Sequence, residues 1–264
     1  MQAIWRGAIN FGLISIPVRL FSATEEKSLR FNLLHKEDGG RRKANWTCSV
    51  CDKTLVQDDL VRGYEYEKGA YVSFEDEEID NVQIDTSHTV EVVHFTQAEQ
   101  IDPIYFLKSY YLAPDELGVK AYGLLRKVLG ETDKVAVTRV AIRDKERLAT
   151  LRVRDNVLVL ETMYWPDEIR EARFAETDRE IEVSDADRKT ANLLVDNLTE
   201  DFDPSQYGDR YREALLEAVD QKIQGNKIVA PAQPAEEATQ VVDLTEALKR
   251  SLEEVKARSK ASGE

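Results

Sequence analysis

Two cysteines at a metal-binding spacing are the first residues in this 264-residue sequence that could do chemistry. Cys48 and Cys51 form a C-x-x-C knuckle, which can give a zinc ion two of the four ligands that it needs. His35 and Asp38 are the nearest candidates for the other two, although aspartate is an unusual ligand in a structural zinc site. Two other interpretations stay open: a plain reduced pair of cysteines, or a redox pair, for which the expected βαβ context is absent.

A basic loop directly before the knuckle is the second chemical feature. Arg41, Arg42 and Lys43 follow two glycines and precede Trp46. Three adjacent cations on a glycine-hinged loop can bind a phosphate backbone without reading base sequence, because each neutralised phosphate releases condensed counterions. The alternative interpretation is a solvent-exposed hairpin tip without a ligand.

The common catalytic motifs are absent from the sequence. It contains no P-loop, no dinucleotide-binding glycine pattern, no nucleophile elbow and no H-E-x-x-H. Two of the three histidines, His88 and His94, flank an alternating strand, where a structural or surface role is the favoured interpretation. We therefore expect no enzyme. A zinc-dependent or redox enzyme centred on the two cysteines is the least favoured alternative, because it lacks positioned acid and base partners.

The composition excludes several classes of protein. Hydrophobic residues make up 42% of the chain and charged residues 33%, which is enough apolar material for a folded core. Two cysteines exclude a disulfide-rich secreted scaffold. No apolar run approaches the roughly 18 residues of a membrane helix, and the N-terminal segment lacks the features of a signal peptide. A soluble cytoplasmic protein with no membrane partner is the expectation.

The net charge of −14 hides an uneven distribution along the chain. Residues 1–50 carry eight Lys/Arg and four Asp/Glu, and residues 117–160 carry ten and five. Residues 71–116 carry one and eleven, and residues 161–264 carry fourteen and twenty-five. An acidic chain can still bind a polyanion when its cations gather on one face. The alternative is that these segments are solvated faces.

Short strands predominate in the first 165 residues, and they must position the basic loop and the knuckle. Period-2 alternation predicts a strand at 14–21, and further strands are expected at 89–95, 135–142, 148–154 and 157–163, the last two joined by a two-residue turn at Asp155-Asn156. A hairpin is expected at 61–74, with its turn at Lys68-Gly69. Pro17 cannot donate to a ladder and therefore predicts an edge or a bulge. One helix is expected from Pro114 or Asp115 to about Leu129, with Gly130 as its end. This pattern favours a barrel or sandwich over an open parallel sheet.

Helices are expected after Trp165-Pro166. Ser184 is the predicted N-cap of a helix that turns Ala191, Leu194, Leu198 and Phe202 toward a core. A second helix is predicted from about Asp209 to Gln224, with one face made of Tyr211, Leu215, Val219 and Ile223.

A linker and a tail complete the chain. Residues 230–240 are rich in Pro, Ala and polar residues and are typical of a linker. Asp243 and Glu246 fit a capping box for a helix with an apolar stripe formed by Leu244, Leu248, Leu252 and Val255. A helix of this length is marginal alone in water, so we expect it to dock on a partner.

Several stretches together resemble the bacterial Ku proteins, the DNA-end-binding factors of non-homologous end joining. The similar stretches are AIWRGAINFGLISIPVRLFSAT (3–24), FNLLHK (31–36), TCSVCDKTL (47–55), VRGYEYEKGAYVSF (61–74), FLKSYYLAP (106–114), VLVLETMYW (157–165) and YREALLEAVDQKIQG (211–225). The resemblance spans about residues 1–225. VVDLTEALKRSLE (241–253) is similar to the short C-terminal segment through which such proteins engage their ligase.

The resemblance implies a mainly β fold with helices. It places a Ku-type β-barrel core at 1–180, with a β-strand bridge at about 36–70 that forms half of a DNA-encircling ring. A helical region at 181–229 would complete a homodimer, 230–240 would be a linker, and 241–264 would be a ligase-interacting helix and tail. The implied function is non-catalytic, sequence-independent binding of double-stranded DNA ends, which protects the ends and recruits or stimulates an ATP-dependent DNA ligase at the bacterial nucleoid.

The resemblance also suggests roles for individual residues. Arg41, Arg42, Lys43 and Trp46 are the first candidates for DNA binding, and Arg30, Lys36, Lys53, Arg62 and Arg6 are weaker ones. The expected partner-binding residues are Leu244, Leu248, Leu252 and Val255, and zinc at Cys48 and Cys51 is the one cofactor considered. Basic residues of 1–50 and 117–160 would face the DNA, and the acidic segments would face away. The alternative function is a β-barrel scaffold for protein–protein interaction without DNA-end specificity.

Overall fold

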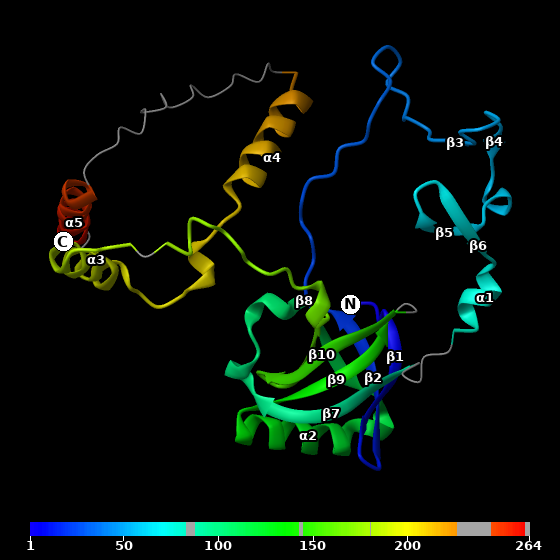
Figure 1. Cartoon of the computed structure of the whole chain (residues 1–264), viewed down its shortest axis with the longest axis horizontal. Helices are drawn as coiled ribbons and strands as arrows, with labels where there is room; N and C mark the ends of the chain where they lie inside the picture. The colour runs from blue at the N-terminus through cyan, green and yellow to red at the C-terminus, as the bar shows by residue number, and fades with distance from the viewer. Residues whose placement is uncertain (83–87, 143–144, 180, 226–243, 262–264) are drawn as a thin grey trace. The chain divides into compact units, whose positions relative to one another are not determined.

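The computed structural model describes the chain except residues 83–87, 143–144, 180, 226–243 and 262–264. It divides into two compact units, Met1–Glu171 and Ala172–Glu264 (Figure 1).

A closed barrel is the centre of the first unit, which confirms the expected mainly β, barrel-type fold (Figure 1). Its seven strands are β1 (Trp5–Phe11), β2 (Ile14–Ser22), β7 (Thr89–Gln97), β8 (Phe106–Pro114), β9 (Lys134–Ile142), β10 (Lys145–Arg154) and β11 (Val157–Met163). Their order around the barrel is β1-β2-β8-β11-β10-β9-β7. Neighbouring strands are antiparallel except β1 and β7, whose parallel pairing closes the barrel.

Alternating residues of these strands fill the barrel interior. The largest fully buried side chains include Ile9, Ile16, Leu20, Leu112, Leu151, Leu158 and Leu160. Because successive strand residues point to opposite faces, the alternation in the sequence becomes an inward apolar set and an outward polar set. Asp155, with φ 52°, and the following asparagine make the predicted two-residue turn between β10 and β11.

Helix α2 (Val119–Thr132) packs on the barrel and follows a 3-10 turn at Glu116–Gly118. Its buried residues include Tyr122, whose hydroxyl donates to the Leu112 carbonyl at 2.6 Å and accepts from the Leu158 N–H at 2.7 Å. Burial raises the pKa of Tyr122. The prediction that Gly130 ends this helix is wrong. The helix continues to Thr132 and ends where Asp133 adopts the left-handed conformation, with φ 51°.

Pro17 lies within β2 of a closed barrel, so its expected placement at a sheet edge or bulge is wrong. It pairs with Ala8 of β1, but the β2–β8 ladder begins only at Val18. The Pro17 carbonyl accepts from the N–H of Asp115, just past the end of β8. Proline is tolerated here because its missing N–H points to the side where the neighbouring strand has already ended.

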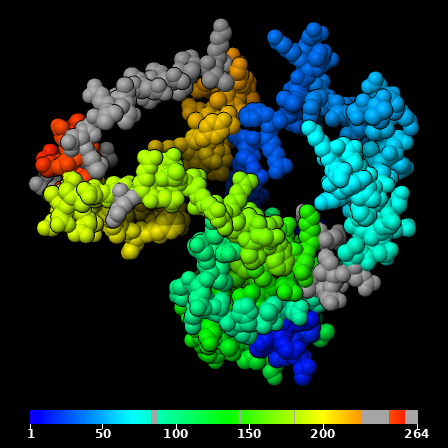
Figure 2. Space-filling model, in the orientation of Figure 1, coloured from blue at the N-terminus to red at the C-terminus, as the bar shows by residue number. Residues whose placement is uncertain are grey.

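The segment between β2 and β7, residues 24–88, is called the arm. It contains β3 (Trp46–Thr47), β4 (Thr54–Leu55), β5 (Arg62–Glu67), β6 (Ala70–Phe74), helix α1 (Asp76–Asp80) and a 3-10 turn at Gln57–Asp59. The predicted hairpin is confirmed as β5–β6, with Gly69 at φ 81° in its turn. No described residue of the arm is buried; its atoms are coloured blue to cyan in Figure 2.

The second unit contains three helices, α3 (Asp185–Leu198), α4 (Arg210–Ile223) and α5 (Leu244–Ala261). Ser184 is confirmed as the cap of α3, since its hydroxyl accepts from the Asp187 N–H at 3.1 Å. The prediction that Leu198 and Phe202 face a core is wrong. The helix ends at Leu198, and Phe202 is 79% exposed and stacks on Tyr207 instead.

Short 3-10 turns connect several of these elements, at Ala98–Gln100, Pro103–Tyr105, Pro166–Glu168 and Pro204–Gln206. The predicted linker at 230–240 and the proposed cap at Asp243 lie outside the described residues. Among the described helices, none has the length and apolar character needed to cross a membrane.

Candidate nucleic-acid interface

A tight hairpin at residues 33–42 presents the basic loop. Leu34 and Arg41 form an antiparallel bridge, and the Arg42 N–H donates to the Leu33 carbonyl at 3.0 Å. The turn between them closes through the His35 N–H, which donates to the Gly40 carbonyl at 2.7 Å. Gly39 adopts φ 71°, a conformation that glycine takes without strain. The two glycines therefore make the turn after which the cations follow.

The three cations of the loop are exposed, and the chain fixes only the first of them. The Arg41 guanidinium donates to the Asn32 side-chain oxygen at 2.6 Å, a neutral partner that leaves its charge intact. Within the described part of the chain, neither Arg42 nor Lys43 forms an ion pair. Successive residues of an extended segment point to opposite sides, so Arg42 and its two neighbours face different directions. The loop can therefore contact phosphates on two sides.

The weaker candidates divide into paired and unpaired cations. Each of three has a carboxylate partner: Arg30 with Glu26 at 3.8 Å, Lys53 with Asp59 at 3.2 Å, and Arg62 with Asp76 at 2.9 Å. Among the described residues, Lys36 and Arg6 form no such pair, and both are exposed. A carboxylate beside a cation cancels part of the field that attracts a phosphate. The geometry therefore ranks the unpaired cations above the paired ones.

Trp46 lies in the short strand β3, opposite Leu55 of β4. Its side chain is 56% exposed, although a tryptophan side chain is usually largely buried. An exposed indole close to three cations can lie against a sugar or a base at a DNA end. The structure thus leaves Trp46 available to a ligand.

In the described part of the chain, three of the ten cations in the basic segment 117–160 lie beside a carboxylate. Arg152 makes two hydrogen bonds to Glu161, at 2.8 and 2.7 Å, and the bond to Glu161 raises the pKa of Arg152. Arg154 lies 3.8 Å from Asp155, and Lys127 lies 3.8 Å from Glu131. The expectation that this segment faces the DNA stays a prediction.

The arm has two halves of opposite charge, a division that the expected bridge at 36–70 overlooked. Residues 27–53 carry seven Lys/Arg and three Asp/Glu, whereas residues 57–80 carry two and nine. In the acidic half, Tyr64 and Val72 are direct partners across the β5–β6 ribbon, and both are exposed. Negative charge repels phosphates, so this half suits contact with protein. The alternation of apolar residues along the hairpin was the sequence signal that could have indicated a surface for protein contact in this half of the arm.

Cys48 and Cys51 are held by a tight knuckle between β3 and β4. The Cys48 N–H donates to the Lys53 carbonyl at 2.9 Å, and the Asp52 N–H donates to the Cys48 carbonyl at 2.9 Å. Hydrogen bonds from the N–H of Val50, the N–H of Cys51 and then the Cys51 thiol lower the pKa of the Cys48 thiol. These donors stabilise a thiolate, which is both a metal ligand and a nucleophile.

The described residues do not complete a zinc site around this pair. Among them, no three His, Cys, Asp or Glu side chains are close enough to hold one metal ion. The two additional ligands suggested by the sequence bind each other instead, with His35 Nδ1 2.9 Å from Asp38 Oδ1. The Gly40 N–H and then His35 lower the pKa of Asp38. Two sulfur ligands alone do not make a structural zinc site, so zinc binding stays a prediction that needs ligands from elsewhere.

The predicted partner-binding stripe lies on α5. Leu248, Leu252 and Val255 are half-buried, and Leu244 is the first residue of the helix. Leu248, Leu252 and Val255 lie on one face of the helix, as the spacing predicted. The sequence did not indicate what covers this face, which is helix α3.

Comparison with known proteins adds the following. The family model of the Ku70/Ku80 beta-barrel domain matches residues 10–192. The chain is 42% identical over 262 residues to the non-homologous end joining protein Ku of Heliobacterium modesticaldum, covering 98% of this chain and 94% of that protein. It is 40% identical over 269 residues to the protein of that name from Mycobacterium tuberculosis, covering 99% and 97%. It is 43% identical over 258 residues to the non-homologous end joining protein Ku of Frankia casuarinae, covering 97% of this chain and 65% of that protein.

Proposed function

The chain belongs to the Ku family of non-homologous end joining proteins, and from this premise we propose that it binds double-stranded DNA ends as a homodimeric ring. In this ring, each copy contributes a barrel and an arm. The protein has no catalytic role of its own: it holds and protects the end and brings an ATP-dependent DNA ligase to it.

The basic loop is the observation that carries this proposal. Arg41, Arg42 and Lys43 extend from an arm without buried residues, and acid neutralises none of them within the described residues. Cations that contact only phosphate bind every sequence with similar affinity. A protein that serves any broken end needs this property, because base contacts would restrict the breaks that it could hold.

The composition of the arm supports the ring. A two-stranded ribbon is marginally stable by itself, so the β5–β6 hairpin needs something to pack on. Its acidic surroundings disfavour DNA as that surface, and a second copy of the chain offers a protein surface. We therefore assign DNA contact to residues 27–53 and contact between copies to residues 57–80.

The recruitment of a ligase is assigned to α5. Its apolar stripe has the spacing of helices that bind in a groove of a partner protein. The eighteen residues 226–243 connect it to α4, so it can reach a partner while the ring stays on the DNA.

The test is a competition between DNA with and without ends. A gel-shift titration at about 150 mM salt compares a short linear duplex with the same sequence as a relaxed closed circle. We expect the linear duplex to bind and the circle to fail as a competitor, because a closed ring loads only over a free terminus. Equal binding of both forms would contradict end-specific threading.

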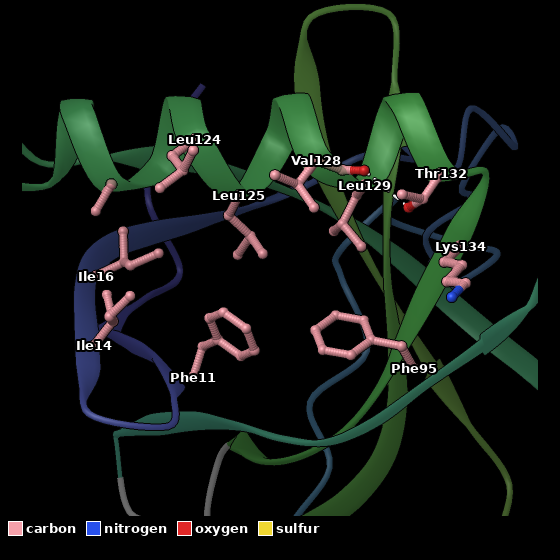
Figure 3. Close-up of a pocket in the computed structure, with 11 residues that line it drawn as sticks. Phe11, Ile14, Ile16, Phe95, Leu124, Leu125, Val128, Leu129, Thr132 and Lys134 are labelled. Carbon is pink, nitrogen blue, oxygen red and sulfur yellow. Dashed lines mark hydrogen bonds between the residues drawn. The ribbon is translucent and has the colours of Figure 1, made fainter.

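A protein-interaction scaffold is the second candidate, and one cavity favours it. A space of about 310 Å³ lies between α2 and the barrel, lined mostly by apolar side chains (Figure 3). Phe11 and Phe95 meet edge to face across it, with ring centroids 5.4 Å apart, and Leu124 and Val128 of α2 border it. Cavities of this character accept apolar groups. If the protein binds neither linear nor circular DNA at physiological salt and captures a protein partner, this function would be favoured.

A further inference from the structure

Helices α3 and α5 pack against each other along matching faces (Figure 1). On α3 the half-buried residues are Asp187, Thr190, Ala191 and Leu194. On α5 they are Thr245, Ala247, Leu248, Leu252 and Val255. Both sets follow the three-and-four spacing of a single helix face. The apolar stripe of α5 therefore already has a partner within its own unit.

A specific hydrogen bond fixes the register of this contact. The Thr245 hydroxyl donates to Asp187 Oδ1 at 2.8 Å, and the Ser184 hydroxyl donates to Asp187 Oδ2 at 2.6 Å. The bond from Ser184, then that from Thr245, and the nearby charge of Lys249 lower the pKa of Asp187. The cap of α3 thus holds the carboxylate in place for the first turn of α5.

Over residues 245–255 of α5, the part whose side chains the structure describes, the outer face offers a partner little apolar surface. The exposed residues there are Glu246, Lys249, Arg250, Ser251, Glu253 and Glu254. A groove that binds amphipathic helices recognises the apolar stripe, which in this structure packs on α3. A ligase that binds α5 through its leucines must therefore displace α3.

Helix α5 can separate from α3. The apolar residues of this contact are half-buried, so a limited area is removed from water. The connection through residues 226–243 keeps α5 near α3 after release, and rebinding is intramolecular. Such a contact covers the stripe at rest and yields to a tighter partner.

Resting on the ligase recruitment proposed above, we propose that α3 is an internal competitor of the ligase for the apolar stripe of α5. In the free protein α5 is docked on α3 and the stripe is covered. Binding of the ligase exchanges one helix contact for another, so recruitment is weaker than the affinity of the exposed stripe would allow.

The test changes α3 and leaves α5 intact. Leu194→Glu places a charge in the face that contacts α5, whereas Leu193→Glu makes the same change at a side chain that is 52% exposed. Hydrogen exchange of the full-length protein is measured at the amides of 246–255. We expect protection in the wild type and in Leu193→Glu and its loss in Leu194→Glu. Rapid exchange of α5 in the wild type would overturn the proposal and leave ligase recruitment standing.

The second measurement is the affinity of each variant for the purified ATP-dependent DNA ligase of the same organism. If α5 is docked nine-tenths of the time, we expect Leu194→Glu to bind about tenfold more tightly than the wild type. Leu193→Glu should match the wild type. Unchanged or weaker binding by Leu194→Glu, with α5 released, would overturn the competition and indicate that the ligase binds both helices together. Absence of ligase binding in every variant would overturn recruitment through α5 and the competition with it, while binding of linear DNA would be unaffected.

Discussion

In the barrel, the seven strands bury most of their Ile, Leu and Val side chains, and Leu151 and Leu160 are fully buried. In the arm, strand β5 also alternates, with tyrosines between charged residues, and it turns Tyr64 to solvent, with 65% of this residue exposed. The strands differ in what lies opposite them, since β10 and β11 belong to a closed barrel and β5 and β6 to an isolated ribbon. A two-stranded ribbon has no second layer against which to bury a face.

This difference separates residues that maintain the fold from residues that are free to bind. Burial of a large aliphatic side chain stabilises a fold by about 1.5–3 kcal/mol, and the barrel holds many such residues. The described part of the arm holds none. Substitutions in the barrel should therefore act on stability, and substitutions in the arm should act on binding.

The largest expected effect is on the barrel core. Leu151→Ala should lower the free energy of unfolding by about 2–5 kcal/mol, because it leaves a cavity among closely packed strands. Tyr64→Ala is the matched change in the arm and, at protein concentrations too low for two copies to associate, should shift the free energy of unfolding by less than about 0.5 kcal/mol. Urea unfolding at several protein concentrations measures both. If Tyr64→Ala lowers the free energy of unfolding by an amount that depends on protein concentration, Tyr64 lies in a contact between copies. A decrease that is the same at every protein concentration would contradict the assignment of stability to the barrel and of binding to the arm.

The next effect is on DNA binding by the basic loop. Replacement of Arg41, Arg42 and Lys43 by Glu should weaken binding of a linear duplex about a hundredfold and lower the salt slope by about three, one per lost phosphate contact. The unfolding midpoint should not change, because all three side chains are exposed. Fluorescence anisotropy across a salt series measures the slope. An unchanged slope would place the DNA on another surface.

Single substitutions test the ranking of paired and unpaired cations. Arg42→Ala should weaken DNA binding several-fold and lower the salt slope by about one. Arg62→Ala is the matched control, since Arg62 is already paired with Asp76 at 2.9 Å and should change neither quantity. The same anisotropy series compares them. Equal effects would mean that the carboxylate partners do not decide which cations bind phosphate.

The smallest effect concerns the thiols of the arm. The pKa of Cys48 lies below the ordinary value for a cysteine, so its thiolate persists to lower pH. Alkylation by iodoacetamide should therefore reach half of its limiting rate at a pH below that of an unperturbed thiol. Cys51→Ala removes the thiol donor, keeps the backbone N–H, and should move this midpoint upward. Mass spectrometry of the Cys48 peptide follows the reaction, and a midpoint unmoved by Cys51→Ala would assign the whole shift to the backbone.

Local sequence patterns were sufficient for many of the elements. The alternation of Ile16, Val18 and Leu20 predicted β2, and the Asp155-Asn156 pair predicted the turn after β10. These signals work because a residue and its near neighbours determine which side of a strand is apolar. Strands β1 and β8 were not predicted, although both lie in stretches that resemble the Ku family.

Within the candidate site, the sequence located the charges and left their partners undetermined. It gave Arg42 as a first candidate for DNA binding and Arg62 as a weaker one without indicating a partner for either, and only Arg62 lies beside a carboxylate, fourteen residues further along the chain. It suggested His35 and Asp38 as ligands for the cysteines, and the structure pairs them with each other. Spacing along a chain does not reveal which side chains a hairpin brings together.

The sequence by itself determined the family, the alternating strands, the capped helices and the position of a basic loop. Only the tertiary structure decided that β1 and β7 close the barrel in parallel, which cations stay unpaired, and that α5 packs on α3. The physical reason is the range of the interactions. Patterning and capping act within a few residues, whereas strand closure, ion pairing and helix docking join residues that the chain brings together only after it has folded.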